Sequence, residues 1–236
     1  MAIALGERQE HVLDAIVREY IRTAEPVGSV AVVEKYRIDA SPATIRNDMA
    51  ELESLGFIRQ PHTSAGRVPT EAAYRYYVKH FIREKPVPRR EAEELRAVWA
   101  LHEAWRDLAK LTAKATAAFT TESVFMAFGR NDVYYTGLSN LFAQPEFAET
   151  ERVVSMSVVI DQLDDVVAGV FEAARENVDV LVGAENPFGS TTSVIVTRCD
   201  LGNSEHILFG LLGPTRMDYD LNVARVKYVR EGLENI

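Results

Sequence analysis

The stretch SPATIRNDMAELESLGF, residues 41–57, contains the start, the buried face and the end of one helix. Ser41 followed by Pro42 is a favourable start, because a serine hydroxyl accepts a hydrogen bond from a free amide and proline suits the first helical position. Gly56 is the residue type that commonly follows a helix C-terminus. The apolar residues between these ends recur at helical spacing: Ile45, Met49 and Leu52. The stretch therefore predicts a helix from Pro42 to about Leu55.

The opposite face of this helix carries small residues and two long polar side chains, Arg46 and Asn47. An asparagine can bond an adenine edge through two hydrogen bonds, and an arginine can bond guanine or phosphate. The helix N-terminus adds free amides and the positive end of the helix dipole, which attract phosphate. This face is typical of a helix that enters the major groove of DNA, although an ordinary capped surface helix shows much of the same pattern.

Two helices are expected before this one. Residues Glu7–Arg22 form an amphipathic pattern, and the residues EPVG at 25–28 interrupt it. Ser29 is expected to begin a short second helix that ends near Tyr36, with its hydroxyl accepting from a free amide. A turn at residues 37–40 then leads to the capped helix. Short helix, turn and capped helix together form a helix-turn-helix pattern.

The residues after the helix predict a β-wing. Phe57–Gln60 is typical of a short strand, and residues 61–69, PHTSAGRVP, of a loop with a proline at each end. Such a wing places Arg67 beside the recognition helix, where its guanidinium could enter a minor groove or bind phosphate. Thr70 is expected to cap a further helix over Glu71–Ile82, whose tyrosines pack inside the domain.

The net charge of −9 hides an uneven distribution. Residues 1–90 hold 14 Lys+Arg and 12 Asp+Glu, whereas residues 91–236 hold 12 and 23. Between Arg59 and Arg90, eight basic residues face only two acidic ones. This asymmetry indicates a module that faces a polyanion, joined to an acidic body. A solvated basic face gives the same run, so the charge supports DNA binding only together with the helix and the wing.

Length and composition predict two domains. A chain of 236 residues with 47% hydrophobic and 26% charged residues is typical of a globular protein. We expect a winged-helix domain over 1–83, a proline-containing linker over 84–90, and a second domain over 91–236 that begins with a long helix. The single cysteine, Cys199, excludes an intramolecular disulfide, and no spacing suits zinc. Without a visible signal peptide or membrane span, the chain is expected to be cytoplasmic and to hold no metal or cofactor.

The second half is expected to be α+β, with helices packed on an antiparallel sheet. The expected strands are 124–128, 133–135, 178–182, 192–198 and 206–212, and the expected helices are 91–119, 146–177 and 221–233. The first of these helices carries apolar residues at alternating three- and four-residue spacing: Val98, Leu101, Trp105, Leu108, Thr112, Ala115 and Phe119. This spacing suits a helix–helix seam between two protomers, or packing of the helix on the chain's own sheet.

No catalytic motif is visible in the second half. The sequence offers no nucleophile–base pair and no phosphate-binding glycine loop. Glu185 and Arg216 are expected to hold loops through ion pairs, and Cys199 is expected to be buried and inert. The chain is therefore not expected to be an enzyme.

Several long runs resemble one known family. They are EYIRTAEPVGS at 19–29, residues 41–70 from SPATIRND to SAGRVPT, GLSNLFAQPEF at 137–147, GAENPF at 183–188 and GPTRMDY at 213–219. In these runs the chain resembles HrcA, the heat-inducible transcription repressors. The resemblance implies a winged-helix DNA-binding domain followed by a GAF-like domain. It also implies a homodimer that represses chaperone genes from the inverted repeat called CIRCE, with the chaperonin GroEL keeping the repressor active.

The resemblance also implies a set of DNA-binding residues. The matching positions are Ser29, Ser41, Pro42, Thr44, Arg46, Asn47, His62, Thr63, Ser64, Gly66 and Arg67. We assign Thr44, Arg46 and Asn47 to the major groove, Ser41 with the helix amides to phosphate, and Arg67 to the wing contact. Gly66 is expected to supply backbone freedom. Asp48 lies toward the buried side and is expected to orient Arg46 or a neighbouring helix.

The second half departs from the family in one respect. Family members carry a long insertion that forms much of the dimer contact, but here only residues 120–135 separate the helix ending near Phe119 from GLSNLF. We therefore expect the insertion to be missing and do not carry over the family's dimer geometry. The function that we expect is a dimeric DNA-binding repressor of heat-shock genes. The alternative is a ligand- or protein-binding regulatory module whose winged helix contacts proteins, and the salt dependence of binding separates the two.

Overall fold

The structure is a computed structural model, and it describes residues 5–62, 65–148, 150–173, 177–202 and 205–236. It consists of two compact units, residues 1–82 and 83–236. The first boundary of the expected linker therefore lies close to the division between the units. Each unit is described here by itself.

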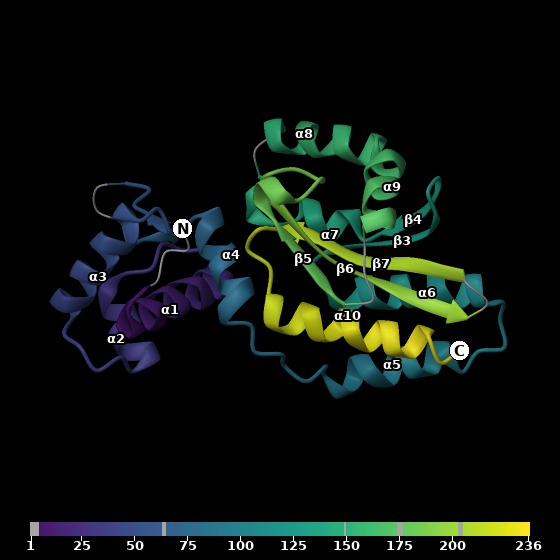
Figure 1. The fold of residues 1–236 in the computed structure, drawn as a ribbon, viewed down its shortest axis with the longest axis horizontal. Helices are drawn as coiled ribbons and strands as arrows, with labels where there is room; N and C mark the ends of the chain where they lie inside the picture. Colours follow the sequence, from purple (N-terminus) through teal and green to yellow (C-terminus); the bar gives the residue numbers. More distant parts are fainter. Residues whose placement is uncertain (1–4, 63–64, 149, 174–176, 203–204) are drawn as a thin grey trace. The chain divides into compact units, whose positions relative to one another are not determined.

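The first unit is a winged helix, as predicted (Figure 1). Its elements are α1 (Glu7–Thr23), α2 (Ser29–Tyr36), α3 (Pro42–Ser54), β1 (Ile58–Arg59), β2 (Val68–Pro69) and α4 (Glu71–His80). The helices bury one apolar core: Val12, Leu13, Ile16, Val32, Ile45, Leu52, Tyr74 and Tyr77. The helical periodicity of the sequence therefore located these helices to within a few residues.

The two ends of α3 confirm the start and the end that residues 41–57 predict for this helix. The Ser41 hydroxyl accepts a hydrogen bond from the Thr44 amide at 3.1 Å, and Pro42 is the first helical residue. Gly56 has a left-handed φ of 79° just beyond the C-terminus. The second helix begins at Ser29 and ends at Tyr36 as predicted, but the capping role predicted for the Ser29 hydroxyl is wrong, because the extended residue before α2 is Gly28 and Ser29 already lies inside the helix. A side chain within the first turn is not placed to cap that turn.

Thr70 precedes α4 as expected but does not cap it through its side chain. Its hydroxyl donates instead to the carbonyl oxygens of Gly56 at 2.6 Å and Phe57 at 2.9 Å. Thr70 therefore ties the start of α4 to the residues that follow α3.

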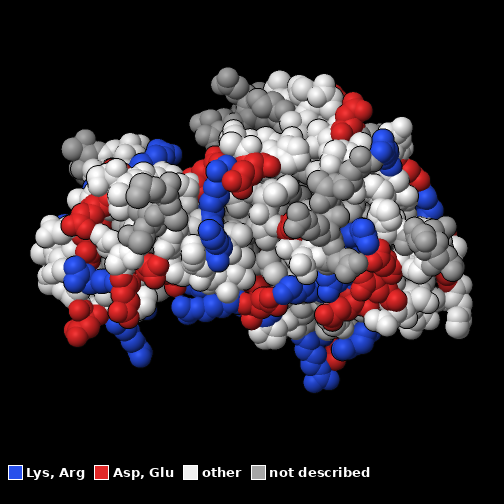
Figure 2. All heavy atoms as spheres, in the orientation of Figure 1, with Lys and Arg blue, Asp and Glu red and all other residues white. Residues whose placement is uncertain are grey.

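The boundary between the units changes the interpretation of the charge. Residues 1–82 contain 10 Lys+Arg and 11 Asp+Glu, a net charge of −1. The other four basic residues of the 59–90 run belong to the second unit, where Lys85, Arg89 and Arg90 form ion pairs with acidic residues. Figure 2 shows acidic and basic side chains interspersed on the face of the first unit that it presents. Any attraction of this unit for a polyanion must therefore come from a local arrangement of a few side chains.

The second unit is built on a five-stranded antiparallel sheet with the order β4-β3-β7-β6-β5. The strands are β3 (Ser123–Gly129), β4 (Asp132–Thr136), β5 (Asp179–Val182), β6 (Thr192–Gly202) and β7 (Glu205–Pro214). The helices are α5 (Arg89–Trp99), α6 (Trp105–Phe119), α7 (Leu138–Phe142), α8 (Thr150–Asp161), α9 (Leu163–Ala173) and α10 (Tyr219–Leu233), with short 3-10 turns η1 (Pro145–Phe147) and η2 (Gly183–Glu185). The expected fold class, an antiparallel sheet with packed helices, is confirmed.

Helices cover both faces of this sheet (Figure 1). One face packs under α7, α8 and α9 around a core that includes Phe125, Phe147, Phe188, Val194 and Leu212. The other face packs against α6 and α10, and α5 packs on these two helices. The alternation of apolar side chains along β3, β6 and β7 supplies both layers, since neighbouring residues in a strand point to opposite faces.

The long helix expected over 91–119 is wrong. The chain forms α5 and α6 with residues 100–104 between them, and the two helices pack on each other. The Trp99 indole donates to the Thr112 hydroxyl at 3.0 Å and contacts Tyr228 of α10. These contacts require the chain to fold back, so tertiary packing outweighs a helical pattern that could have continued.

The apolar residues expected to form a helix–helix seam are consequently divided between α5, α6 and the residues between them. Leu108 and Thr112 are buried in α6, Val98 and Ala115 are half-buried, and Leu101 and Trp105 are 47% and 42% exposed near the break. The expected helix over 146–177 is likewise divided, into η1, α8 and α9.

A buried ion pair joins three helices of the second unit. The Arg225 guanidinium of α10 donates to the Glu91 carboxylate of α5 at 2.7 and 2.8 Å, and also to the Phe119 carbonyl at the end of α6. Both side chains are about nine-tenths buried, at 9% and 11% exposure. A buried charge with its partner removed is costly, so this pair fixes how the helices meet.

The beginning of the second unit is fastened to the start of α10. The Arg83 amide donates to the Asp220 carboxylate at 3.0 Å, and the Lys85 ammonium pairs with Asp218 at 2.8 Å. Lys85, which lies in the linker expected over 84–90, is therefore held to the start of α10. Within the described residues, none of the helices is both long enough and apolar enough to cross a membrane.

Candidate nucleic-acid interface

Helix α3 presents a buried face and an open face. Ile45 and Leu52 are fully buried against the core, whereas Arg46 and Asn47 are exposed. Among the described residues Arg46 has no ion partner, so its guanidinium donors are available to a ligand. The exposed acidic residue of α3, Glu51, lies in the C-terminal half, so the N-terminal half offers the more favourable surface for an anion.

Asp48 on the same helix has a structural role. Its carboxylate is 3% exposed and accepts two hydrogen bonds from the Arg8 guanidinium of α1, at 2.7 and 3.0 Å. Its hydrogen bonds raise the pKa of Arg8. The expectation that Asp48 orients a neighbouring helix is therefore correct, and the helix is α1.

The wing is attached to the segment before α2 by its backbone. β1 pairs with β2, and Arg67 forms an isolated bridge with Val27 in which each amide donates to the other's carbonyl at 2.8 Å. A Cβ atom on Gly66 would lie 2.4 Å from the carbonyl carbon of Val27. Gly66 is thus required for close approach of two backbones, whereas we had expected it to supply conformational freedom. It is not among the residues with positive φ.

Arg67 does not extend freely from the wing. Its guanidinium lies 3.0 Å from the Glu53 carboxylate of α3, and its side chain is only 19% exposed. The other Glu53 oxygen accepts from the Gln60 amide at 2.9 Å, and the Gln60 side chain donates to the Ala65 carbonyl at 3.0 Å. The wing arginine is therefore held against the recognition helix.

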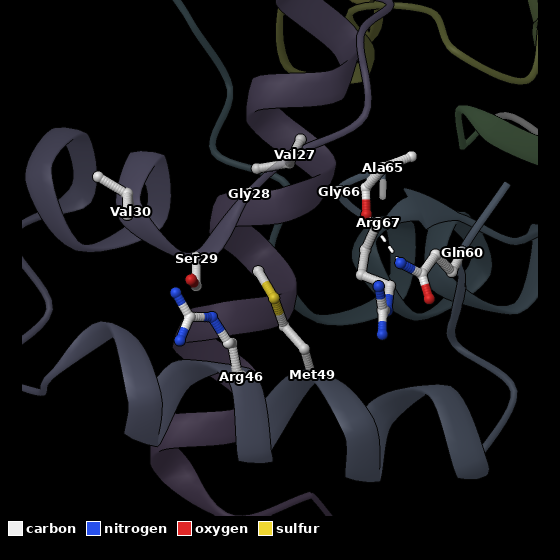
Figure 3. Close-up of a pocket in the computed structure, with 10 residues that line it drawn as sticks. All are labelled: Val27, Gly28, Ser29, Val30, Arg46, Met49, Gln60, Ala65, Gly66 and Arg67. Atoms are coloured by element: carbon white, nitrogen blue, oxygen red, sulfur yellow. Dashed lines mark hydrogen bonds between the residues drawn. The ribbon is translucent and has the colours of Figure 1, made fainter. Parts of the chain in front are cut away.

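A cavity of about 450 Å³ lies between α2, α3 and the wing (Figure 3). Its lining residues are Val27, Gly28, Ser29, Val30, Arg46, Met49, Gln60, Ala65, Gly66 and Arg67. Arg46 and Arg67 reach toward it from opposite sides, and Arg46 points toward Ser29 (Figure 3). No acidic residue is among those lining residues, and α2 has no acidic residue in its first turn. This arrangement brings two guanidinium groups, one of them paired with Glu53, to one cavity in a unit whose net charge is close to zero.

The structure brings four of the predicted site residues together at this cavity. Ser29, Arg46, Gly66 and Arg67 line the cavity. Ser41 and Thr44 lie at the start of α3 with their hydroxyl oxygens 2.9 Å apart, next to Pro42, and Asn47 is exposed one turn later. His62 is exposed in the wing loop, and Thr63 and Ser64 lie outside the described residues.

Among the residues that sequence reasoning did not assign to this site, Val27, Glu53 and Gln60 hold the wing in place. Val27 pairs with the wing, and Glu53 connects the wing to α3. An acidic residue near the end of a recognition helix is a signal that could have indicated a basic partner in the wing. The backbone pairing of Val27 has no comparable signal, because it depends on the folded position of residues far along the chain.

Outside this interface, the candidates in the second unit are structural. Arg216 donates to Glu146 at 2.5 Å and to Gln144 at 3.1 Å, so it holds η1 as expected. Cys199 is buried, and burial raises the pKa of its thiol. In the part of the chain that the structure describes, no group of three His, Cys, Asp or Glu side chains is arranged to hold a metal.

A wing, an exposed recognition helix and a cavity between them that two arginines line define a DNA-binding transcription regulator of the winged-helix class. Two family models match this chain. "Winged helix-turn-helix transcription repressor, HrcA DNA-binding" covers residues 4–80, and "HrcA protein C terminal domain" covers residues 77–223. The chain belongs to the HrcA family, whose curated members are heat-inducible transcription repressors.

Individual relatives support this assignment. The heat-inducible transcription repressor HrcA of Carboxydothermus hydrogenoformans is 27% identical over 336 positions, which cover 98% of each chain. The HrcA repressor of Pelotomaculum thermopropionicum is 54% identical over 92 residues, 39% of this chain and 26% of that one. A crystal structure described as a hypothetical protein superposes with a TM-score of 0.78 at 20% identity over 98% of both chains, which supports the fold.

The length of the first alignment also bears on the expected insertion. It spans 336 positions, whereas this chain has 236 residues, so about 100 positions have no residue of this chain. A relative that is matched almost from end to end must therefore carry internal residues that this chain lacks.

Proposed function

We propose that this repressor binds, as a homodimer, a CIRCE-type inverted repeat in double-stranded DNA and represses chaperone genes there. The observation that carries the proposal is the position of Arg46 and Asn47, exposed on the N-terminal half of α3 beside the cavity that also holds Arg67. One winged helix reads one half-site, so an inverted repeat requires two protomers.

Each site residue has a proposed role at the duplex. Arg46, Asn47 and Thr44 read base edges in the major groove, where arginine and asparagine discriminate best. Ser41 and the first amides of α3 bind one phosphate, and Ser29 with the start of α2 lies at a second. Pro42 and Gly66 shape the backbone. Arg67 makes the wing contact, together with the loop residues His62, Thr63 and Ser64.

The second unit has the proposed role of dimerisation and regulation. Because the family's usual insertion is missing, we place the dimer contact on the remaining surface of this unit, where Leu101 and Trp105 are exposed apolar side chains. The family resemblance adds the chaperonin GroEL as the partner that keeps the repressor active, in the cytoplasm. No catalytic step is proposed.

Binding of the full chain to a duplex carrying the CIRCE repeat, compared with a scrambled duplex at several salt concentrations, tests the proposal. We expect a strong preference for the repeat, two protomers per duplex, and a loss of about tenfold or more in Arg46→Ala, as for one discriminating base contact. Arg67→Ala should also make the slope of log affinity against log salt shallower by about one, because the variant loses one phosphate contact and releases about one counterion fewer.

The alternative function, a winged helix that contacts proteins, predicts a different result. Protein contacts release few counterions, so binding would show a shallow salt dependence and no preference for the repeat. Weak binding to both duplexes would therefore contradict the repressor proposal and favour the alternative.

A further inference from the structure

One carboxylate joins both arms of the wing to the recognition helix. Glu53 lies in the last turn of α3, and its Oε1 accepts from the Gln60 amide at 2.9 Å while its Oε2 lies 3.0 Å from Arg67 Nη2. Gln60 follows β1 and Arg67 precedes β2. The two oxygens of Glu53 therefore hold the two different arms of the wing.

Arg67 is fixed before any ligand arrives. Its backbone is paired with Val27 in both directions, its guanidinium is on Glu53, and its side chain is 19% exposed. A guanidinium has five N–H donors, and the ion pair with Glu53 is made by Nη2. The side chain has thus already lost much of its rotamer freedom, while donors remain for a ligand that enters the cavity.

The same carboxylate is unfavourable for general binding to a polyanion. Its charge lies 3.0 Å from the Arg67 guanidinium at the edge of the cavity, so it repels the phosphates of every duplex to a similar degree. A guanidinium held in one place favours only those duplexes whose groove or phosphate matches that place. Specificity is a difference of affinities, and a repulsive group is one way to produce it.

We propose that Glu53 is a positioning residue that makes DNA binding sequence-selective, because it fixes the Arg67 guanidinium at the cavity that Arg46 also lines, while lowering affinity for DNA in general. The inference rests on the proposed function, since it concerns how the same interface distinguishes one duplex from another.

The test compares full-length wild type and Glu53→Gln on the CIRCE duplex and on the scrambled duplex. Glutamine keeps an oxygen for the Gln60 amide but removes the charge that holds Arg67. We expect the ratio of the two affinities to fall about fivefold, which corresponds to an ion pair at the upper end of the range for partly exposed pairs. The affinity for the scrambled duplex should stay the same or rise.

Glu51→Gln is the matched control. It makes the same charge change on the same helix, but the Glu51 side chain contacts Gln9 of α1 and has no contact with the wing among the described residues. This variant should therefore leave the affinity ratio unchanged. An equal fall of the ratio in Glu51→Gln and Glu53→Gln would overturn the proposal.

A double-mutant cycle with Arg67→Ala shows whether Glu53 acts through Arg67. In the Arg67→Ala background, Glu53→Gln should no longer change the ratio. A fall of undiminished size in that background contradicts the proposal. If Glu53→Gln weakens binding to both duplexes equally, Glu53 has only a structural role, and the proposal is contradicted.

The two proposals fail in different ways. Wild type that prefers neither duplex contradicts the proposed function itself. Wild type that prefers the repeat, together with a Glu53→Gln variant that retains the full preference, contradicts only the role of Glu53.

Discussion

The wing of the first unit and the sheet of the second unit are stabilised in different ways. In the wing, one short strand pair, a backbone bridge to Val27 and the Glu53 carboxylate position the loop, while Ile58 and Val68 pack into the core. The sheet has β7 paired on both sides and apolar layers on both faces. The position of the wing loop can therefore be altered by a single residue, whereas the sheet distributes its stability over many residues.

The two units also use a close glycine contact differently. A Cβ on Gly66 would meet the backbone of Val27, and a Cβ on Gly210 of β7 would meet the ring of Phe125 at 2.3 Å. The first contact brings a loop to a strand-like segment, and the second seats an aromatic ring in the core. At these two glycines, the close contact in the wing is with a backbone and the close contact in the sheet is with a side chain.

The largest effect on stability is expected from removing the buried ion pair between Glu91 and Arg225 in the second unit. Glu91→Ala leaves the Arg225 guanidinium buried without its carboxylate, which should lower the free energy of unfolding by about 3 kcal/mol. Both tryptophans, Trp99 and Trp105, lie in this unit, so urea unfolding followed by tryptophan fluorescence reports on it selectively. Glu93→Ala, in an exposed pair with Arg89, is the control and should cost less than about 0.5 kcal/mol. Equal losses of unfolding free energy in the two variants would show that burial of the Glu91–Arg225 pair does not increase its contribution to stability.

A smaller loss of stability is expected from the wing, with a large loss of function. Gly66→Ala should destabilise the first unit by about 2 kcal/mol, since the new methyl group forces the Val27 and Arg67 backbones apart. Amide hydrogen exchange at Val27 and Arg67 should accelerate, and preference for the CIRCE duplex should disappear. Gly28→Ala is the control for hydrogen exchange alone, because a Cβ at Gly28 meets nothing within 4 Å but Gly28 itself lines the cavity. Unchanged exchange at Val27 in Gly66→Ala would contradict the close-approach argument.

The smallest expected effect is a pH dependence confined to the first unit. Glu19 of α1 is 5% exposed and binds Arg22 and Lys35, and the hydrogen bond from Arg22 is the main cause that lowers its pKa below the ordinary value of 4.5. A carboxyl whose pKa is lower in the folded state stabilises that state above the unfolded pKa, and loses this contribution as the pH falls through the folded pKa.

The advantage of wild type over Glu19→Gln, about 1 kcal/mol at neutral pH, should therefore shrink below about pH 4.5. Hydrogen exchange of α1 amides across this range measures it. The exposed Glu34→Gln variant should show no such trend, and tryptophan-detected unfolding of the second unit should not differ between the variants. If the stability difference between wild type and Glu19→Gln grew toward low pH, the pKa of Glu19 would be raised in the folded state and not lowered.

The features that sequence reasoning predicted correctly are local ones. The capped start of α3, the apolar period of α1 and the runs that became β3 to β7 each depend on residues within one segment. The break between α5 and α6 depends on Trp99 meeting Thr112 and lying against Gly232, which no local pattern encodes. The candidate site divides in the same way. The exposure of Arg46 follows from helical periodicity, whereas the pairing of Arg67 with Glu53 requires the wing to be folded.

The order of strands in the sheet has a consequence for synthesis of the chain. β3 pairs with β7, so the centre of the sheet cannot close until about 80 further residues have been made. At ribosomal rates this interval is roughly 4 to 16 s. The winged helix needs no such delay, since its contacts are formed within the first 82 residues. During translation, the winged helix can therefore fold while the β3–β4 hairpin still has an unpaired edge, because β7 has not yet been made. The nascent second unit therefore exposes apolar surface while the first unit is already able to fold.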